Sequence, residues 1–152
     1  DGTLSLGMGL ALALGPMVLV TGDLALLHDS NGWLLSHQGR PQLVVLLIDN
    51  GGGGIFEQLP IETVPSEAFE QLFAMPQPVD HFALAQAHEI PFRQVACLDD
   101  LQTSLEWSFS QGGPVLLRVC TDRHKDFVLR QGLRKDLEKY LQLNAQKSLL
   151  DF

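Results

Sequence analysis

Residues 43–54 read LVVLLIDNGGGG, an apolar run that ends in a carboxylate, an amide and four consecutive glycines. The continuous aliphatic part, 43–48, is typical of a strand that is covered on both faces, as strands of parallel sheets are. A second apolar run, 17–20, ends in the same way, in Thr21-Gly22-Asp23. We therefore predict two buried parallel strands, each followed directly by polar residues and glycines.

The segments around these strands alternate between helical and strand-like patterns. We predict helices over 4–14, 24–37, 80–88, 98–109 and 126–143, and further strands over 92–95 and 115–119. Residues 59–78 contain four prolines and are expected to form an irregular excursion. Regular alternation of strands and helices predicts an α/β fold in three layers (α/β/α), with a mostly parallel sheet covered by helices on both faces.

Length and composition exclude several classes of protein. The chain has 152 residues, 45% hydrophobic and 18% charged, which suits one domain with a proper core. The net charge of −8 argues against nucleic-acid binding and against adhesion to an anionic membrane. Residues 3–22 carry no charge, but glycines and Pro16 interrupt them and no basic residue flanks them, so we predict no transmembrane segment and no signal peptide. The chain begins at Asp1 and is expected to be part of a longer protein.

Isolated polar and sulfur-containing side chains carry weaker signals. Cys97 and Cys120 lie in apolar stretches, and we expect both to be reduced and buried, in a reducing compartment. The five histidines show no metal-ligand spacing and are expected to lie at the surface or to cap helices; they are His28, His37, His81, His88 and His124. Five basic residues are expected to form a solvated face, namely Arg123, Lys125, Arg130, Arg134 and Lys135.

The ends of the two predicted strands carry the candidate site. In an open parallel sheet, ligands bind outside the carboxyl ends of the strands, where Asp23 and Asn50 offer hard oxygen ligands. The glycines at 51–54 allow backbone groups to approach a ligand. The pattern predicts a site for magnesium and a diphosphate. A turn with a helix cap and a mobile glycine loop are the alternatives, whereas a P-loop and a dinucleotide fingerprint do not fit the spacing.

These residues also carry a family resemblance. Gly22-Asp23 followed by Asn50 is similar to the signature of thiamine-diphosphate enzymes. More narrowly, the blocks at 1–5, 21–32 and 50–60 resemble the 2-succinyl-5-enolpyruvyl-6-hydroxy-3-cyclohexene-1-carboxylate synthases of menaquinone and phylloquinone biosynthesis. The resemblance covers essentially the whole chain, 1–152, as the C-terminal diphosphate- and magnesium-binding domain of a larger enzyme. It implies the thiamine-diphosphate-binding fold.

The resemblance assigns roles to individual residues. It implies Mg²⁺ ligands at Asp23, Asn50 and the carbonyl of Gly52, completed by two diphosphate oxygens and a water. Backbone groups in the segments that follow the two predicted strands would hold thiamine diphosphate, at Gly22, Leu24, Ala25, Gly52, Gly53 and Gly54. An apolar wall near the thiazolium ring is implied at Ile55, Phe56 and Leu59. The chain departs from the family at Asp49, where relatives often have Asn.

The implied function is that of a cytoplasmic carboligase. Such an enzyme decarboxylates 2-oxoglutarate and adds the succinyl unit to isochorismate. The activating Glu and a substrate-binding Arg would lie outside this chain, so we expect the chain alone to be inactive. The pyrimidine-binding domain of another subunit would complete the site in a homodimer or homotetramer. Alternatives are an acetolactate-synthase-like enzyme, a 2-oxoacid decarboxylase, or a non-catalytic α/β binding module.

Overall fold

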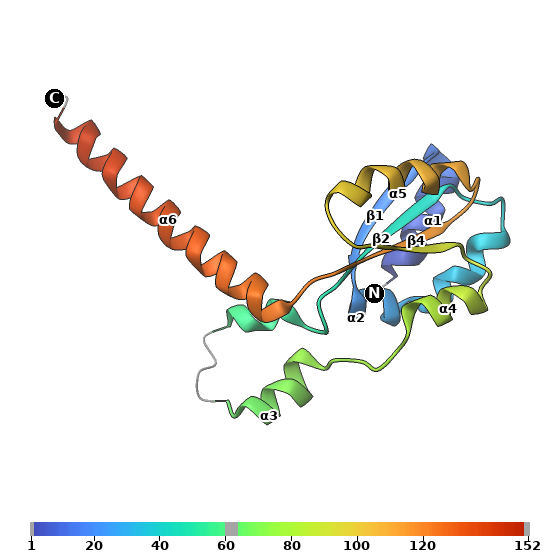
Figure 1. Cartoon of the computed structure of the whole chain (residues 1–152), viewed down its shortest axis with the longest axis horizontal. Helices are drawn as coiled ribbons and strands as arrows, with labels where there is room; N and C mark the ends of the chain where they lie inside the picture. Colours follow the sequence, from blue (N-terminus) through green and yellow to red (C-terminus); the bar gives the residue numbers. More distant parts are fainter. Residues whose placement is uncertain (1, 60–63, 151–152) are drawn as a thin grey trace.

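The computed structural model describes residues 2–59 and 64–150, with side chains as far as residue 142. Within these residues, four parallel strands form a sheet in the order β1-β2-β4-β3 (Figure 1). The strands are β1 (Met17–Gly22), β2 (Leu43–Asp49), β3 (Phe92–Val95) and β4 (Val115–Cys120). The helical segments are α1 (Thr3–Leu14), α2 (Asp23–His28), η1 (Ser30–His37), η2 (Gly54–Gln58), α3 (Ser66–Phe69), η3 (Glu70–Ala74), α4 (His81–Ala87), α5 (Asp99–Ser110) and α6 (Arg123–Leu150).

Alternate residues of β2 point into two apolar clusters, one on each face of the sheet. Leu43, Val45 and Leu47 face the first cluster, which includes buried residues of α1, α2, η1 and α4. Val44 faces the second cluster, to which α5 contributes Leu101, Leu105 and Trp107. The predicted three-layer α/β/α architecture and the parallel sheet are therefore confirmed. The continuous apolar run of β2 is explained by its helices on both faces.

The segment 24–37 is not the single helix that the sequence predicts. It forms α2 and then η1, a 3₁₀ helix, with the break at Asp29. The Asp29 carboxylate accepts hydrogen bonds from the backbone N–H of Ser5 (2.7 Å) and from its hydroxyl (2.9 Å). Asp29 and Ser5 lie 24 residues apart in the sequence. A prediction from local pattern does not include such a contact, and the prediction of one continuous helix was therefore wrong.

The proline-containing excursion is more ordered than the sequence suggests. Residues 66–74 are helical, first as α3 and then as η3, which is a π-helical turn. Pro65 precedes these helices and Pro76 follows them, so neither interrupts a hydrogen-bonded turn. The expectation of an irregular segment was wrong for 66–74, whereas 60–63, including Pro60, lie outside the described residues.

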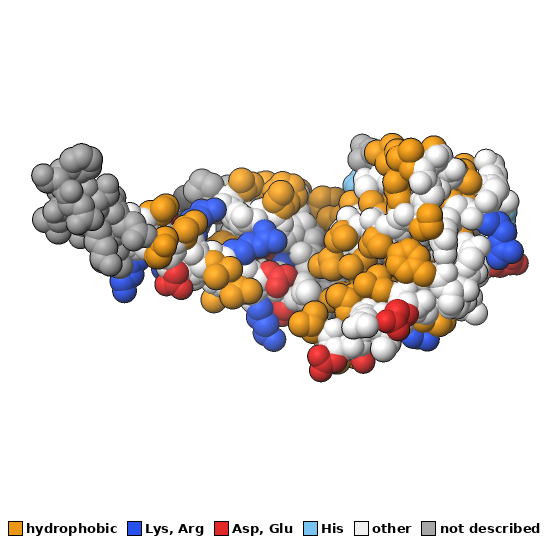
Figure 2. Space-filling view, turned by 90° about the horizontal axis from the view of Figure 1, so that it is seen from above, with side chains coloured by type: hydrophobic (Ala, Val, Ile, Leu, Met, Phe, Trp, Pro, Cys, Tyr) orange, Lys and Arg blue, Asp and Glu red, His pale blue; other side chains and the backbone are white. Residues whose placement is uncertain are grey.

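The last helix was predicted over 126–143 and runs over Arg123–Leu150 as α6. It projects from the sheet (Figure 1), and Leu129, Leu133 and Leu137 on it are exposed. Figure 2 shows apolar side chains at the surface of both the compact part and the projecting helix. Across the described residues, no helix combines the length and the apolar content that crossing a membrane requires.

Three kinds of side chain lie where the sequence did not place them. Cys97 and Cys120 are free thiols, as expected, but both are exposed, because Cys97 lies in the loop between β3 and α5 and Cys120 is the last residue of β4. His81, expected at the surface, is 5% exposed at the start of α4. Its Nδ1 is buried with no hydrogen-bond partner among the described atoms. Arg123, expected in a solvated face, is largely buried and is described with the site below.

Burial lowers the pKa of His81 from its ordinary value, and the charge of Asp49 raises it less. The unfolded chain therefore binds a proton at a higher pH than the folded chain does. We expect the free energy of unfolding to decrease as the pH falls below about 6.5, the unperturbed histidine pKa. His81→Phe should reduce this decrease, as measured by urea unfolding at pH 8 and pH 5. His37→Phe, at an exposed histidine, is the control; an equal effect of both variants would contradict the assignment.

Candidate functional site

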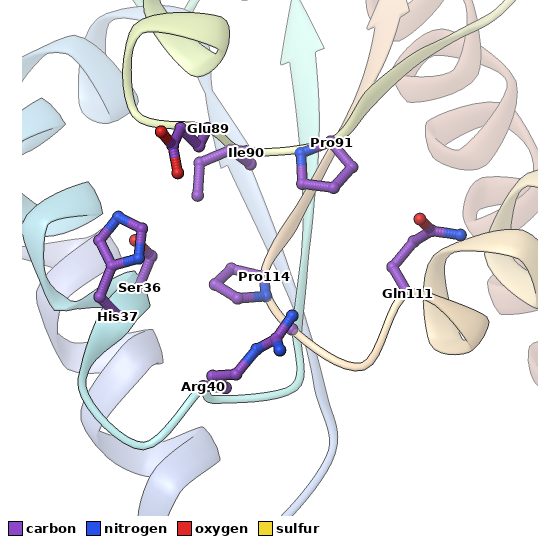
Figure 3. Close-up of a pocket in the computed structure, with 9 residues that line it drawn as sticks. Ser36, His37, Arg40, Glu89, Ile90, Pro91, Gln111 and Pro114 are labelled. Carbon is purple, nitrogen blue, oxygen red and sulfur yellow. The ribbon is translucent and has the colours of Figure 1, made fainter.

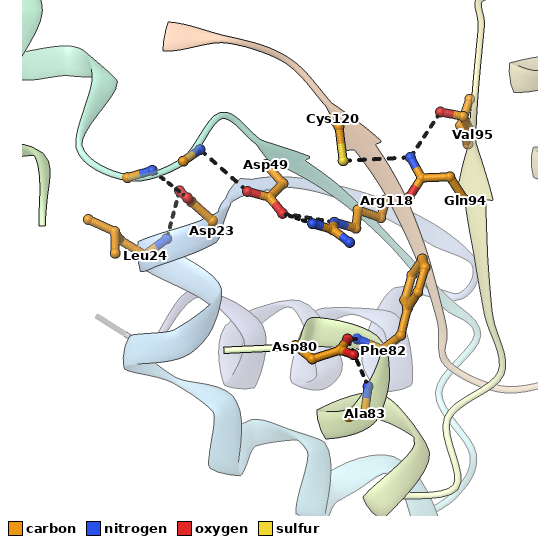
Figure 4. A network of polar contacts seen from close by, with 12 residues as sticks. Asp23, Leu24, Asp49, Asp80, Phe82, Ala83, Gln94, Val95, Arg118 and Cys120 are labelled. Atoms are coloured by element: carbon orange, nitrogen blue, oxygen red, sulfur yellow. Dashed lines mark hydrogen bonds and ion pairs between the residues drawn. The ribbon is translucent and has the colours of Figure 1, made fainter. Parts of the chain in front are cut away.

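The carboxyl ends of β1 and β2 meet at one edge of the sheet. Gly22 of β1 lies opposite Ile48 of β2, so Asp23 and the glycine loop 51–54 emerge side by side. Asp23 is 7% exposed, and its Oδ1 accepts a hydrogen bond from the N–H of Leu24 at 2.9 Å. Its Oδ2 accepts another from the N–H of Gly52 at 2.6 Å, which joins the two strand ends (Figure 4).

Asp23 is a buried carboxylate that forms no ion pair with any described residue. Buried charges in proteins are normally paired or bind metals, so this carboxylate fits a cation. No group of three or more His, Cys, Asp or Glu side chains is placed to hold a metal in the described part of the chain. A cation at Asp23 would therefore take its other ligands from amide and backbone oxygens and from a bound ligand.

The glycine loop is shaped by contacts that exclude side chains. Gly52 has φ +121°, and a Cβ there would lie 2.2 Å from the carbonyl oxygen of Ala74. The N–H of Gly53 donates a hydrogen bond to this same oxygen at 2.6 Å. A Cβ on Gly53 would lie 2.4 Å from the carbonyl oxygen of Phe73. Backbone of η3 thus packs directly against backbone of the loop, which only glycines allow.

The other predicted ligands lie around this loop. The amide nitrogen of Asn50 lies over Gly54, 2.7 Å from where a Cβ of that glycine would be. The carbonyl of Gly52 accepts a hydrogen bond from the N–H of Gly54 at 2.8 Å and keeps a second lone pair for a cation. Gly22, directly before α2, and Ala25 within it are both exposed, and since Gly22 has no side chain its exposure is that of its backbone.

The predicted apolar wall is divided in the structure. Phe56 lines a cavity of about 680 Å³ together with Leu24 and Phe73. Ile55 instead lines a cavity of about 270 Å³ that contains Asn50 and Gly54. Leu59 lines a third cavity, also beside Phe56. Phe56 thus shares a cavity with Leu24, which follows β1, whereas Ile55 shares one with Asn50 and Gly54, which follow β2.

Two arginines that the sequence analysis did not connect with the site lie at this edge. Arg118 of β4 forms an ion pair with Asp49, with its Nη2 2.6 Å from Oδ2 (Figure 4). Asp49, which stands where relatives often have Asn, is therefore paired with the positively charged side chain of Arg118. Arg123 follows β4 and donates a hydrogen bond to the carbonyl of Gly51 at 2.5 Å. Arg123 follows the carboxyl end of a third parallel strand, β4, where ligands of such sheets bind. This position in the sequence could have identified it as a residue of the site.

A separate cavity of about 300 Å³ lies at the opposite, amino-terminal ends of the strands (Figure 3). Pro91 and Pro114, which precede β3 and β4, line it with Arg40, Glu89 and Gln111. It shares no lining residue with the cavities that contain Asn50 or Phe56. This cavity is therefore separate from the candidate site at the carboxyl edge of the sheet.

This geometry agrees with a match to a family of known proteins. Residues 2–119 match the model of the thiamine pyrophosphate enzymes, C-terminal TPP binding domain. The chain belongs to this family. The cofactor of this domain is accordingly thiamine pyrophosphate, also called thiamine diphosphate, and the site at the carboxyl edge of its sheet offers a carboxylate and a glycine loop that fit it.

Similar curated proteins cover nearly the whole chain. It is 68% identical over 151 residues (99% of the chain, 26% of the relative) to a 2-succinyl-5-enolpyruvyl-6-hydroxy-3-cyclohexene-1-carboxylate synthase of Prochlorococcus marinus (strain MIT 9313). It is 67% identical over 139 residues (91% of the chain, 24% of the relative) to a protein of the same name from Synechococcus sp. (strain CC9311). The chain thus spans about a quarter of the length of these relatives.

Solved structures share the fold of this thiamine pyrophosphate domain. Benzoylformate decarboxylase from Polynucleobacter necessarius aligns with a TM-score of 0.64 and 20% identity, covering 80% of the chain and 23% of that protein. The 4-hydroxybenzoylformate decarboxylase of Rhodococcus jostii RHA1 aligns with a TM-score of 0.62 and 18% identity, covering 78% and 23%. At these identities the likeness concerns the fold alone.

We predict that Gly52→Ala weakens cofactor binding by about a hundredfold or more, because the new Cβ would overlap the carbonyl of Ala74 and the φ of +121° disfavours it. Titration calorimetry of the full-length enzyme with thiamine diphosphate and Mg²⁺ measures the change. Gly132→Ala is the matched control, since nothing lies within 4 Å of a Cβ there. Unchanged affinity in Gly52→Ala would show that the loop does not shape the site.

Proposed function

We propose that this chain is the diphosphate- and magnesium-binding part of a 2-succinyl-5-enolpyruvyl-6-hydroxy-3-cyclohexene-1-carboxylate synthase. The observation that carries the proposal is the 68% identity, over 99% of the chain, to a protein of that name. The whole enzyme would decarboxylate 2-oxoglutarate and add the succinyl unit to isochorismate. Nothing specific to this site favours an acetolactate synthase, a 2-oxoacid decarboxylase or a non-catalytic module.

In this proposal, Asp23, the side-chain oxygen of Asn50 and the carbonyl of Gly52 hold Mg²⁺. Support comes from the buried Asp23 carboxylate, which has no ion pair within the described part of the chain, and from the free lone pair on Gly52. Two diphosphate oxygens and a water would complete the six oxygen ligands that Mg²⁺ requires. Backbone groups of Gly22, Leu24, Ala25, Gly53 and Gly54 would hold the diphosphate.

When bound, thiamine diphosphate supplies the nucleophilic carbon and the electron sink for decarboxylation of a 2-oxoacid. The residues of this chain bind and orient its diphosphate end and limit the access of water. Phe56, with Ile55 and Leu59 nearby on and after η2, would provide apolar surface beside the reacting atoms. Its ring contacts Phe73 edge to face, at 5.8 Å between centroids, which holds it in place.

We further propose that the pyrimidine-binding domain of a second subunit completes the site, in a homodimer or homotetramer. The chain spans about a quarter of its relatives and would be inactive by itself. A cytoplasmic location is proposed as well, which suits the two free, exposed cysteines because thiols persist in reducing compartments.

The decisive experiment assays the full-length enzyme with Mg²⁺ and thiamine diphosphate. We expect 2-oxoglutarate to be decarboxylated and its succinyl unit to appear on isochorismate, as measured by mass spectrometry of the product. Release of CO₂ from benzoylformate or pyruvate, with none from 2-oxoglutarate, would contradict the proposed substrates while leaving the cofactor site intact.

Asp23→Ala should abolish Mg²⁺-dependent binding of thiamine diphosphate, because it removes the single charged ligand in the proposed set. Asn50→Ala removes a neutral ligand and should weaken binding less. Calorimetric titration of both variants measures the difference, and Asp99→Ala, at an exposed carboxylate on α5, is the control. Full affinity in Asp23→Ala would refute the metal site.

Phe56→Ala should leave cofactor affinity nearly unchanged and lower kcat about tenfold, which corresponds to about 1.4 kcal/mol, because water enters beside the reacting atoms. Phe92→Ala is the matched control, since both phenylalanine residues are 37% exposed and Phe92 lies on β3, away from the glycine loop. Loss of cofactor binding at unchanged kcat would instead assign Phe56 to the support of the glycine loop.

A further inference from the structure

Arg123 is the first residue of α6, and its side chain is 11% exposed. All three guanidinium nitrogens are used. Nη1 donates to the carbonyl of Gly51 at 2.5 Å, Nε donates to Glu57 at 3.0 Å, and Nη2 donates to Glu70. These partners belong to the glycine loop, to η2 and to η3, so one side chain joins three segments that lie apart in the sequence.

The contact with Gly51 fixes the orientation of one peptide group. In a trans peptide, the carbonyl and the following N–H point in opposite directions. Arg123 binds the carbonyl of Gly51, and the carboxylate of Asp23 binds the N–H of Gly52 at 2.6 Å. The Gly51–Gly52 peptide is therefore held from both sides, directly before the Gly52 carbonyl that is the proposed Mg²⁺ ligand.

The two carboxylates connect this peptide to the neighbouring helices. Glu70 begins η3 and Ala74 ends it, and the carbonyl of Ala74 accepts the N–H of Gly53 at 2.6 Å. Arg123 thus binds one end of η3 while the loop itself binds the other. Burial by itself would lower the pKa of Arg123, but the hydrogen bonds with Glu70 and Glu57 outweigh it and raise the pKa, so the guanidinium stays charged.

We propose that Arg123 is a positioning residue that holds the glycine loop in its cofactor-binding shape, by orienting the Gly51–Gly52 peptide and fixing η2 and η3 against it. This inference rests on the proposed binding of Mg²⁺ and diphosphate at the loop. A lysine is a poor substitute, because a single ammonium group cannot reproduce the planar fork that reaches three partners.

The test uses the full-length enzyme with Arg123→Gln, Arg123→Lys and the control Arg134→Gln, at an exposed arginine on α6. Calorimetry measures the affinity for thiamine diphosphate at several Mg²⁺ concentrations. Hydrogen exchange of the apo enzyme compares a peptide over 50–58 with one over 43–48 of β2. We expect Arg123→Gln to weaken cofactor binding about tenfold or more and to accelerate exchange in 50–58 only, with Arg123→Lys intermediate and Arg134→Gln unchanged.

A role in overall stability alone would raise exchange in both peptides and leave the cofactor affinity of the folded enzyme unchanged, which would overturn the inference. Equal effects of Arg134→Gln would do the same. If Arg123→Gln does not fold, Glu70→Gln removes one charged partner and should show the same loop-specific change, with no added effect in combination with Arg123→Lys. Failure of the wild type to act on 2-oxoglutarate would refute the proposed substrates and leave this test intact.

Discussion

The hydrogen bond from the N–H of Gly52 to the carboxylate of Asp23 joins the ends of two neighbouring parallel strands, and the site depends on it. Parallel pairing of β1 and β2 brings the strand ends to one edge but does not fix the loops that follow. The bond fixes them, because it binds the residue after β1 to the loop after β2. The same carboxylate lies where the proposed cation and diphosphate would bind.

Glycine is required in this loop because backbone, and not side chains, packs against it. The carbonyl oxygens of Ala74 and Phe73 occupy the space where side chains of Gly52 and Gly53 would be. The excursion between β2 and α4 therefore contributes to the shape of the loop, although no residue of 64–74 belongs to the predicted ligands. In the sequence the site consists of two short motifs. In the structure it is built from four segments, which are the start of α2, the glycine loop, η3 and the start of α6.

The sequence predicted the parts of this fold that depend on local pattern. Continuous aliphatic runs identified β2 and β4. The alternation of strands with helices predicted both the parallel pairing of the strands and the three-layer arrangement. The failures have a common cause in contacts over long sequence distances. Asp29 ends a helix because it binds Ser5. Arg123 is buried because it binds Glu57 and Glu70, although as one of five nearby basic residues it was expected in a solvated face.

The pairing of charges at the carboxyl edge is compatible with the proposed cation site in this acidic chain. The net charge is −8, and several carboxylates lie near the glycine loop. Asp49 is paired with Arg118, and Glu57 and Glu70 share Arg123. These pairs neutralise carboxylates that could otherwise bind a divalent cation away from the loop. Asp23 is buried, accepts hydrogen bonds from backbone N–H groups and forms no ion pair with any described residue, so it is the carboxylate beside the proposed diphosphate site that is left for the proposed Mg²⁺.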